Sequence, residues 1–139
     1  MKNEKFFIGG GLLILLILLI AGFTAYKMYT KPARSVDNES AVTIAAATLA
    51  GEYEADETQA NKKYLDKAIE VTGVITDITT DQQHNTVVML SGTSMSNIKC
   101  AFPTHITALK KGDHITVKGF CTGYLTDVVL NLCKTVPLQ

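Results

Sequence analysis

The sequence predicts a mainly β protein, a small five-stranded Greek-key barrel with a leading α-helix, preceded by one N-terminal transmembrane helix. Three observations support this fold class. Residues 6–26 carry no charge, residues 43–64 repeat apolar side chains at helical spacing, and the rest of the chain holds five short strand patterns separated by turns. We therefore divide the chain into an anchor at 1–26, a polar tether at 27–42, a leading helix packed on the barrel at 43–66, and the barrel at 67–137.

The first segment, FFIGGGLLILLILLIAGFTAY from Phe6 to Tyr26, is uncharged throughout. As a helix it would be about 32 Å long, which matches the apolar core of a bilayer. A cleaved signal peptide is the alternative, because MKNEK precedes an apolar run. The best cleavage frame, GFT at 22–24, places a poorly suited threonine before the cut, and no cysteine precedes Cys100 for lipid attachment. We expect an uncleaved single-pass anchor that contacts the membrane through residues 6–26.

The positive charges beside this segment do not decide which side of the membrane the barrel faces. Counting the terminal amine, three lie before the segment and three after it, the side chains being Lys2, Lys5, Lys27, Lys31 and Arg34. A short tail ahead of a single anchor usually stays inside the cell. We therefore predict an extracytoplasmic, periplasmic barrel rather than a cytoplasmic one.

The soluble part of the chain is acidic, although the whole chain has a formal charge of zero. From Ser35 onward there are eight lysines, no arginine and twelve acidic residues, which gives a formal charge of −4. Proteins that bind nucleic acid neutralise phosphates, and arginine is the best-suited donor for this task. The composition therefore disfavours nucleic acid as the main ligand.

A polar tether follows the anchor, since residues 27–38 contain Pro32 and show no apolar period. A helical pattern then runs from about Thr43, and its apolar members at offsets of 0, 3, 4, 7, 14 and 18 are Ala46, Leu49, Ala50, Tyr53, Ala60 and Tyr64. Gly51 weakens the middle, so two shorter helices are an alternative. We expect this narrow stripe to pack on the barrel, the alternative being a helix that binds a partner.

Five segments after the helix have the composition of strands. They are 68–78, 86–90, 98–102, 114–121 and 127–133. In the first of them Gly73 suits a bulge or a sharp bend. Residues 103–113 are expected to hold a short helical turn that ends at a lysine-glycine stop. Five strands with a helical element between the third and the fourth are typical of a small Greek-key barrel.

Three runs of this sequence resemble the tRNA_anti-like family of OB-fold domains, as found in membrane-anchored bacterial proteins. They are KYLDKAIEVTG at 63–73, IKCAF at 98–102 and LKKGDHITVKGFCTGYLTDVVLNLC at 109–133, the last being the most specific. The resemblance implies an OB-fold barrel whose first strand bends at Gly73. The family supplies no catalytic residues to carry over, and a shared fold does not fix a function.

OB-folds that bind single-stranded nucleic acid use aromatic side chains on the second and third strands and a basic groove. Here the second strand has no aromatic residue, and Phe102 on the third shares a face with Ile98 and Cys100 and is expected in the core. The remaining candidate ligand-binding residues are Lys99, Lys110, Lys111, Lys118, Phe120 and Tyr124.

The cysteines show no metal-binding pattern, because the gaps between them are 21 and 12 residues and no histidine pair accompanies them. We expect no metal site. In the last hairpin Cys121 and Cys133 would be about three residues out of register, too far for a disulfide. OB topology would instead bring Cys133 to Cys100, so a Cys100–Cys133 disulfide is a hypothesis. The alternative is three small buried apolar side chains.

No serine-histidine-aspartate order, glycine-rich phosphate loop or close carboxylate pair appears, and the aspartates are typical of turns. We expect neither an enzyme nor a cofactor. The predicted function is a non-catalytic, membrane-anchored binding module for a protein, a peptide or an envelope glycan. One alternative is an OB domain that binds tRNA-like or other single-stranded nucleic acid. A second is a thiol- or metal-responsive domain.

Overall fold

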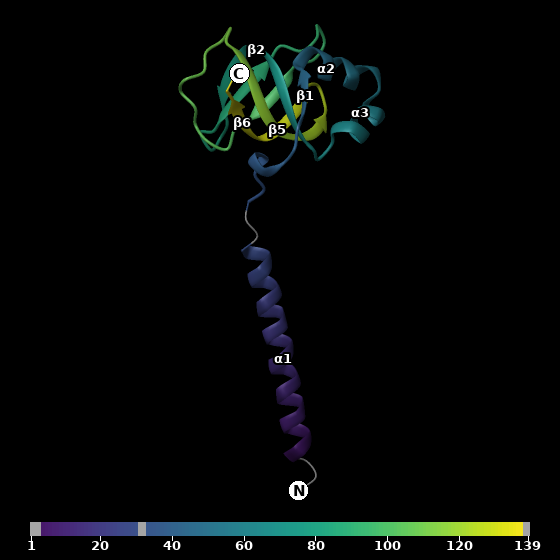
Figure 1. Ribbon diagram of the computed structural model, residues 1–139. Coiled ribbons are helices and arrows are strands. Elements are labelled where there is room, and N and C mark those ends of the chain that lie inside the picture. Colours follow the sequence, from purple (N-terminus) through teal and green to yellow (C-terminus); the bar gives the residue numbers. More distant parts are fainter. Residues whose placement is uncertain (1–3, 31–32, 138–139) are drawn as a thin grey trace. The chain divides into compact units, whose positions relative to one another are not determined.

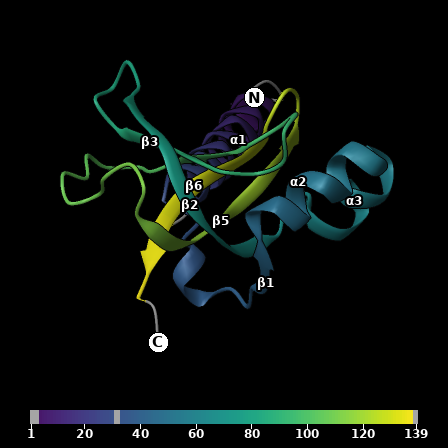
Figure 2. The same cartoon turned by 90° about the horizontal axis from the view of Figure 1, so that it is seen from above.

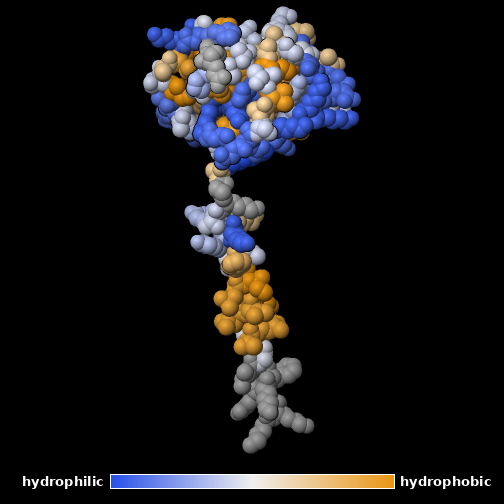
Figure 3. Space-filling view, in the orientation of Figure 1, coloured by the Kyte–Doolittle hydropathy of each residue, from blue (hydrophilic) through white to orange (hydrophobic). Residues whose placement is uncertain are grey.

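The computed structural model describes residues 4–30 and 33–137, with the backbone alone at 4–8. The chain divides into two compact units, 1–34 and 35–139. In the first, helix α1 (Glu4–Tyr29) includes a stretch from Gly9 to Tyr29 that is long and apolar enough to cross a membrane. Figure 3 shows its apolar side chains on the helix surface. The predicted N-terminal apolar helix is confirmed. Lys2, Lys31, Pro32 and the side chain of Lys5 lie outside the described part of the chain.

The second unit is built around a closed β-barrel (Figure 1). Its strands are β2 (Ala68–Thr80), β3 (Thr86–Leu90), β4 (Ile98–Ala101), β5 (His114–Tyr124) and β6 (Val128–Val136). They pair in the order β2-β3-β4-β6-β5, and β5 closes the circle by pairing with β2. The β4–β6 pairing is parallel and the others are antiparallel. The predicted five-stranded barrel is confirmed.

A sixth strand, β1 (Val42–Ala45), pairs in parallel with the first half of β2, from Val42 opposite Ile69 to Ala45 opposite Thr72. The helical pattern had been predicted to begin at Thr43. These residues are extended instead, because they pair with the first half of β2, which β3 does not reach. Their β-branched side chains favour a strand at this edge.

Strand β2 serves both halves of the barrel because it is 13 residues long and bends. Its register against β3 shifts between Ile75 and Asp77, so the bulge follows Gly73 rather than including it. Gly73 has a different role. A Cβ there would lie 2.9 Å from Ala46 Cβ and 3.3 Å from Leu90 Cβ, so glycine permits the close approach of α2 and β3.

The leading helical segment forms two helices, α2 (Ala46–Ala55) and α3 (Glu57–Tyr64), which lie together at one side of the barrel (Figure 2). The break falls at Asp56 rather than at Gly51. Asp56 ends α2 with an extended backbone, and its side chain accepts a hydrogen bond from the Gln59 amide at 3.0 Å, which caps α3. The predicted apolar stripe is buried and joins the barrel core.

Residues 103–113 form no helical turn, so that prediction is wrong. Apart from one turn, in which Asp113 N–H donates to the Lys110 carbonyl at 3.1 Å, the hydrogen bonds of this segment run to the strands. The Thr86 hydroxyl accepts from the Ile106 amide at 2.7 Å, and Gly112 N–H donates to the Ile75 carbonyl at 2.8 Å. Pro103 at one end and Gly112, with φ of +91°, at the other both disfavour helix.

Candidate ligand-binding surface

The outer face of β3 and β4, where OB-folds commonly hold ligands, carries no aromatic side chain. Alternate residues on these strands, such as Leu90 and Ile98, lie in the core. The residues on the opposite face are Val87, Met89, Lys99 and Ala101. Lys99 is exposed, but its neighbours offer no ring on which a base could stack.

Two of the candidate lysines lie before β5. The Lys111 ammonium is 2.7 Å from the Asp77 carboxylate on β2, and this hydrogen-bonded pair holds the pKa of Asp77 below its usual value. Lys110 lies beside it in the exposed turn, where its backbone N–H donates to Asp113. Lys111 therefore already has an anionic partner on the same barrel.

Lys118 is bound by the segment that leads into the barrel. Residues 35–39, which we call the clasp, include the short 3₁₀ turn η1 (Val36–Asn38). Lys118 Nζ donates to the Glu39 carbonyl oxygen at 2.6 Å, and its cross-strand neighbour Lys134 forms an ion pair with Asp37. The hydrogen bond from Lys134 is the main reason why the pKa of Asp37 lies below its usual value.

The same clasp covers Phe120. The Val36 side chain is 1% exposed and packs with Phe120, 4% exposed, and Ala68. This cluster is separate from the barrel core, which contains the neighbouring Cys121. Phe120 therefore offers no open ring face to a ligand while the clasp is in place.

Tyr124 is held as one member of an aromatic stack. Its ring lies 5.6 Å from that of Tyr53 on α2 at an interplanar angle of 22°, and Tyr53 lies 6.3 Å from Tyr64 on α3. The Tyr53 hydroxyl is 3.2 Å from Cys121 Sγ, and burial raises the pKa of Tyr53 well above its usual value. A register shift between Cys121 and Gly123, with φ of +120° at Gly123, marks a bulge in β5, after which Tyr124 still pairs with Val128.

An open hollow of about 500 Å³ lies beside Tyr124, between α3 and the β5–β6 hairpin. Residues that line it include Glu57, Asn61, Leu65, Tyr124, Leu125 and Val129. Leu125 at the hairpin tip is 88% exposed and Leu65 is 38% exposed. Asn61 Oδ1 is buried and accepts no hydrogen bond within the part of the chain that the structure describes. An unpaired buried acceptor costs about 1–3 kcal/mol, so this oxygen is an unusual feature of the wall.

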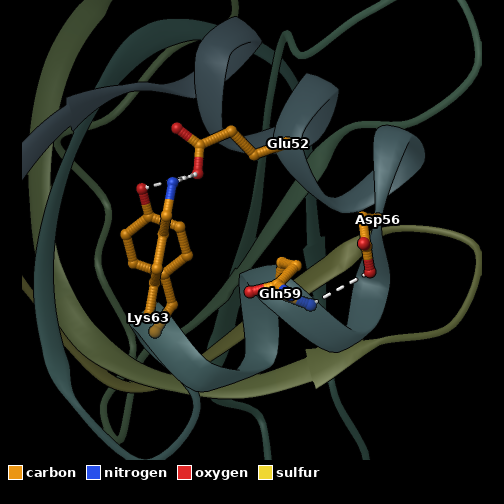
Figure 4. A network of polar contacts seen from close by, with 5 residues as sticks. Glu52, Asp56, Gln59 and Lys63 are labelled. Carbon is orange, nitrogen blue, oxygen red and sulfur yellow. Dashed lines mark hydrogen bonds and ion pairs between the residues drawn. The ribbon is translucent and has the colours of Figure 1, made fainter.

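The corner between α2 and α3 fixes the helical wall of this hollow (Figure 4). Glu52 Oε2 accepts from Lys63 Nζ at 2.9 Å and from the Tyr64 hydroxyl at 3.0 Å, which ties the two helices together. Burial, followed by this bond to Glu52, raises the pKa of Tyr64 to about 12. Glu57 and Asn61, one turn apart on α3, are thereby held toward the hairpin.

The three cysteines are buried free thiols. The structure brings Cys100 and Cys133 together, and the hydrogen bond between their side chains, with burial, raises the pKa of Cys100. Cys133 Sγ also donates to the Leu130 carbonyl at 3.4 Å. The Cys100–Cys133 disulfide stays a prediction. Among residues 4–30 and 33–137, no three His, Cys, Asp or Glu side chains are grouped to hold a metal ion.

The six predicted ligand residues do not form one surface. Phe120 and Lys118 lie under the clasp, Tyr124 lies at the far end of the same strand, and Lys99 lies on β4. The other residues that line the hollow, above all Glu57, Asn61 and Leu65, were not predicted from the sequence. The signal that could have directed attention there was an apolar Leu125 between Tyr124 and the turn residues Thr126 and Asp127.

The closed β2-β3-β4-β6-β5 barrel, with its parallel β4–β6 pairing, defines an OB-fold protein. A family model for tRNA_anti-like proteins matches residues 1–135, and the chain belongs to the tRNA_anti-like family. The chain is similar in fold to a solved lipoprotein from Klebsiella pneumoniae subsp. pneumoniae MGH 78578, for which nucleic-acid binding is a suggested property. The TM-score is 0.56 at 20% identity over 68% of this chain and 92% of that one. No curated protein matches this chain.

Proposed function

We propose that this protein is a non-catalytic, membrane-anchored OB-fold module that binds an extracytoplasmic protein or peptide. The observation that carries the proposal is the kind of side chain that lines the hollow beside Tyr124. It combines exposed leucine side chains with the carboxylate of Glu57, and none of the described residues that line it is basic. Apolar surface with a few fixed polar groups suits a peptide, whereas a carboxylate without a cation repels phosphates.

The proposed location rests on α1. Its side chains from Gly9 to Tyr29 are exposed to solvent over a length that would span a bilayer, and burial in lipid would remove that exposure. We propose that this helix is retained as a single anchor and that the barrel lies outside the cytoplasm. The similarity in fold to a lipoprotein, a class attached to cell envelopes, supports the same location.

Single-stranded nucleic acid is the second candidate, and the suggested property of the Klebsiella lipoprotein favours it. The geometry of this chain supports it less well. Phe120 is covered, and Lys111 and Lys118 are engaged by groups of the same chain. Nucleic acid would also have to reach the barrel, and nucleic acid is scarce at the extracytoplasmic location proposed here.

The test is photo-crosslinking of the full chain in living cells, with a photoreactive amino acid at Leu125. We expect covalent adducts with one or a few envelope proteins. Met95, which is 77% exposed on the β3–β4 loop, is the matched control position and should not capture the same proteins. A reporter fused after Gln139 should be active only outside the cytoplasm. Nucleic-acid adducts at Leu125, or a reporter active only in the cytoplasm, would overturn the proposal.

A further inference from the structure

The hollow beside Tyr124 has a chemistry that selects among peptides. We infer that it binds the side chain of a lysine or arginine in an extended peptide. The inference rests on the proposed function and names the feature that this site would recognise. It follows from the polar groups, the apolar walls and the charge around the hollow.

The polar groups in the wall are acceptors. Glu57 contributes a carboxylate, and Asn61 contributes an Oδ1 that has no hydrogen-bond partner among the described residues. A buried acceptor of this kind is satisfied only by a donor. Because Asn61 lines the hollow, a ligand donor that enters the hollow comes next to this amide. Lysine and arginine carry donors only, and their positive charge complements Glu57.

The apolar walls suit the aliphatic stem of such a side chain. Leu65, Leu125 and Val129 face the hollow, and lysine and arginine bury their methylene groups against such surfaces while the charged head stays near polar groups. The Tyr124 ring adds an attractive face for a cation. Its stacking on Tyr53 holds that ring in place before any ligand arrives.

The surrounding charge excludes the opposite class of ligand. None of the described residues that line the hollow is a lysine or an arginine, and the chain from Ser35 onward has a formal charge of −4. An acidic side chain or a phosphate would meet Glu57 without a compensating cation. The volume of about 500 Å³ is larger than one side chain needs, and leaves room for the adjoining backbone of an extended peptide.

The experiment measures peptide binding to the full chain in nanodiscs of neutral phosphatidylcholine, so that the lipid itself does not attract basic peptides. The probes are acetylated and amidated pentapeptides, Gly-Ser-Xaa-Ser-Gly, with lysine, arginine, norleucine or glutamate at the centre. By calorimetry we expect the lysine and arginine peptides to bind about tenfold more tightly than the norleucine peptide. The glutamate peptide should show no saturable binding. Empty nanodiscs provide the background.

Two matched variants locate the binding. Glu57→Gln keeps the shape of the side chain but removes the charge, and should weaken the lysine peptide about tenfold. Glu70→Gln makes the same change on β2, where Glu70 accepts from Thr43, and should leave binding unchanged. The inference would be overturned if the lysine and norleucine peptides bound with equal affinity, or if neither basic peptide bound. It would also be overturned if Glu57→Gln bound the lysine peptide as tightly as the unaltered chain does. The proposed function would survive these results if Leu125 still crosslinks to envelope proteins, and fails separately if it does not.

Discussion

Gly119 and Cys133 share one small space inside the barrel, and this contact sets a strict limit on residue size at position 119. A Cβ on Gly119 would lie 2.7 Å from Cys133 Sγ and 3.3 Å from the Asn131 carbonyl oxygen. Cys133 is 1% exposed in a close-packed core and cannot easily withdraw. Gly51 is in the opposite situation, because open space surrounds it on α2.

These two glycines should therefore respond in opposite ways to the same substitution. Gly119→Ala should lower the free energy of unfolding by about 1–3 kcal/mol through overpacking. Gly51→Ala should raise it by about 0.5–1 kcal/mol, because alanine favours helix. Urea unfolding of the full chain in neutral detergent, followed by circular dichroism, measures both. Cys133→Ala removes the sulfur, so the double variant should be less destabilised than the two single changes added together. Unchanged stability in Gly119→Ala would contradict the crowding.

The candidate site shows what residue-level patterns predict and what they miss. Tyr124 was predicted as a ligand residue and does line the hollow, because an aromatic side chain near a hairpin tip is a visible signal. Glu57 and Asn61 carry no such signal. They meet Tyr124 only because α3 packs beside the hairpin, more than sixty residues away in sequence. Phe120 has the same visible signal as Tyr124, but it is buried beneath Val36, a contact that no local pattern predicts.

At the scale of elements, the five barrel strands were predictable and the two short elements before the helices were not. The runs that form β2 through β6 are rich in apolar and β-branched residues and are bounded by turn residues, which appears directly in the sequence. Strand β1 has four residues, and η1 has three, and both depend on distant partners. Strand β1 exists through its pairing with β2, and η1 through its contacts with β5 and β6. For this reason the clasp was predicted only as part of the polar tether at 27–42.

The clasp should detach without unfolding the barrel when its apolar contact is lost. Val36→Asp places a charge at a position that is 1% exposed, between Phe120 and Ala68. Loss of a buried valine side chain corresponds to about 1.5–3 kcal/mol, so amides of residues 35–39 should exchange hydrogen at least about tenfold faster. Amides of β5 and β6 should keep their protection. Hydrogen exchange read by mass spectrometry measures both regions.

The control for this variant is Val42→Asp, which places the same charge at a position that is 63% exposed and should not change hydrogen exchange in the clasp.

Acid should also loosen the clasp, in the same direction as Val36→Asp. The pKa of Asp37 is depressed below its usual 3.8 by Lys134, so the contribution of this pair is complete above pH 3.8 and is lost as pH falls through the lower folded value. Lys134→Met should reduce this acid dependence, because Lys134 is the largest of the groups that lower the pKa of Asp37. If the amides of residues 35–39 exchanged hydrogen equally slowly in Val36→Asp and in the unaltered chain, Val36 would not be the contact that holds the clasp.

At the scale of the whole molecule, the fold and the family were predictable while the ligand was not. The strand-forming runs, the helical stripe and the apolar N-terminal segment are properties of continuous sequence, and each is present in the structure. Which ligand the barrel binds depends on which lysine side chains have no partner within the folded chain. Of the four candidate lysines, Lys111 and Lys118 are engaged by Asp77 and Glu39, which the count of charges alone could not reveal.

This distribution of charge leads to a prediction for nucleic acid. Of the four candidate lysines, Lys99 and Lys110 have neither an ion pair nor a hydrogen bond from the ammonium group among the described residues. If both contacted phosphates of a single strand, the logarithm of the affinity would fall with that of the salt concentration at a slope of about −1.4. Between 50 and 200 mM salt, the affinity would then fall only about sevenfold. We expect binding of short single-stranded DNA and RNA to be weaker than about 100 µM even at low salt.

Fluorescence anisotropy of labelled oligonucleotides with the full chain in neutral nanodiscs measures this directly, with an established single-strand-binding protein as the positive control. Val36→Asp is an informative second sample, because release of the clasp would expose Phe120, Lys118 and Lys134 together. Weak binding by both samples would mean that the barrel lacks a phosphate-binding surface even when the clasp is open. Micromolar binding by the unaltered chain, with a slope near −4, would require about six phosphate contacts. That many contacts cannot come from Lys99 and Lys110 alone, so this result would refute the peptide-binding proposal in favour of nucleic acid.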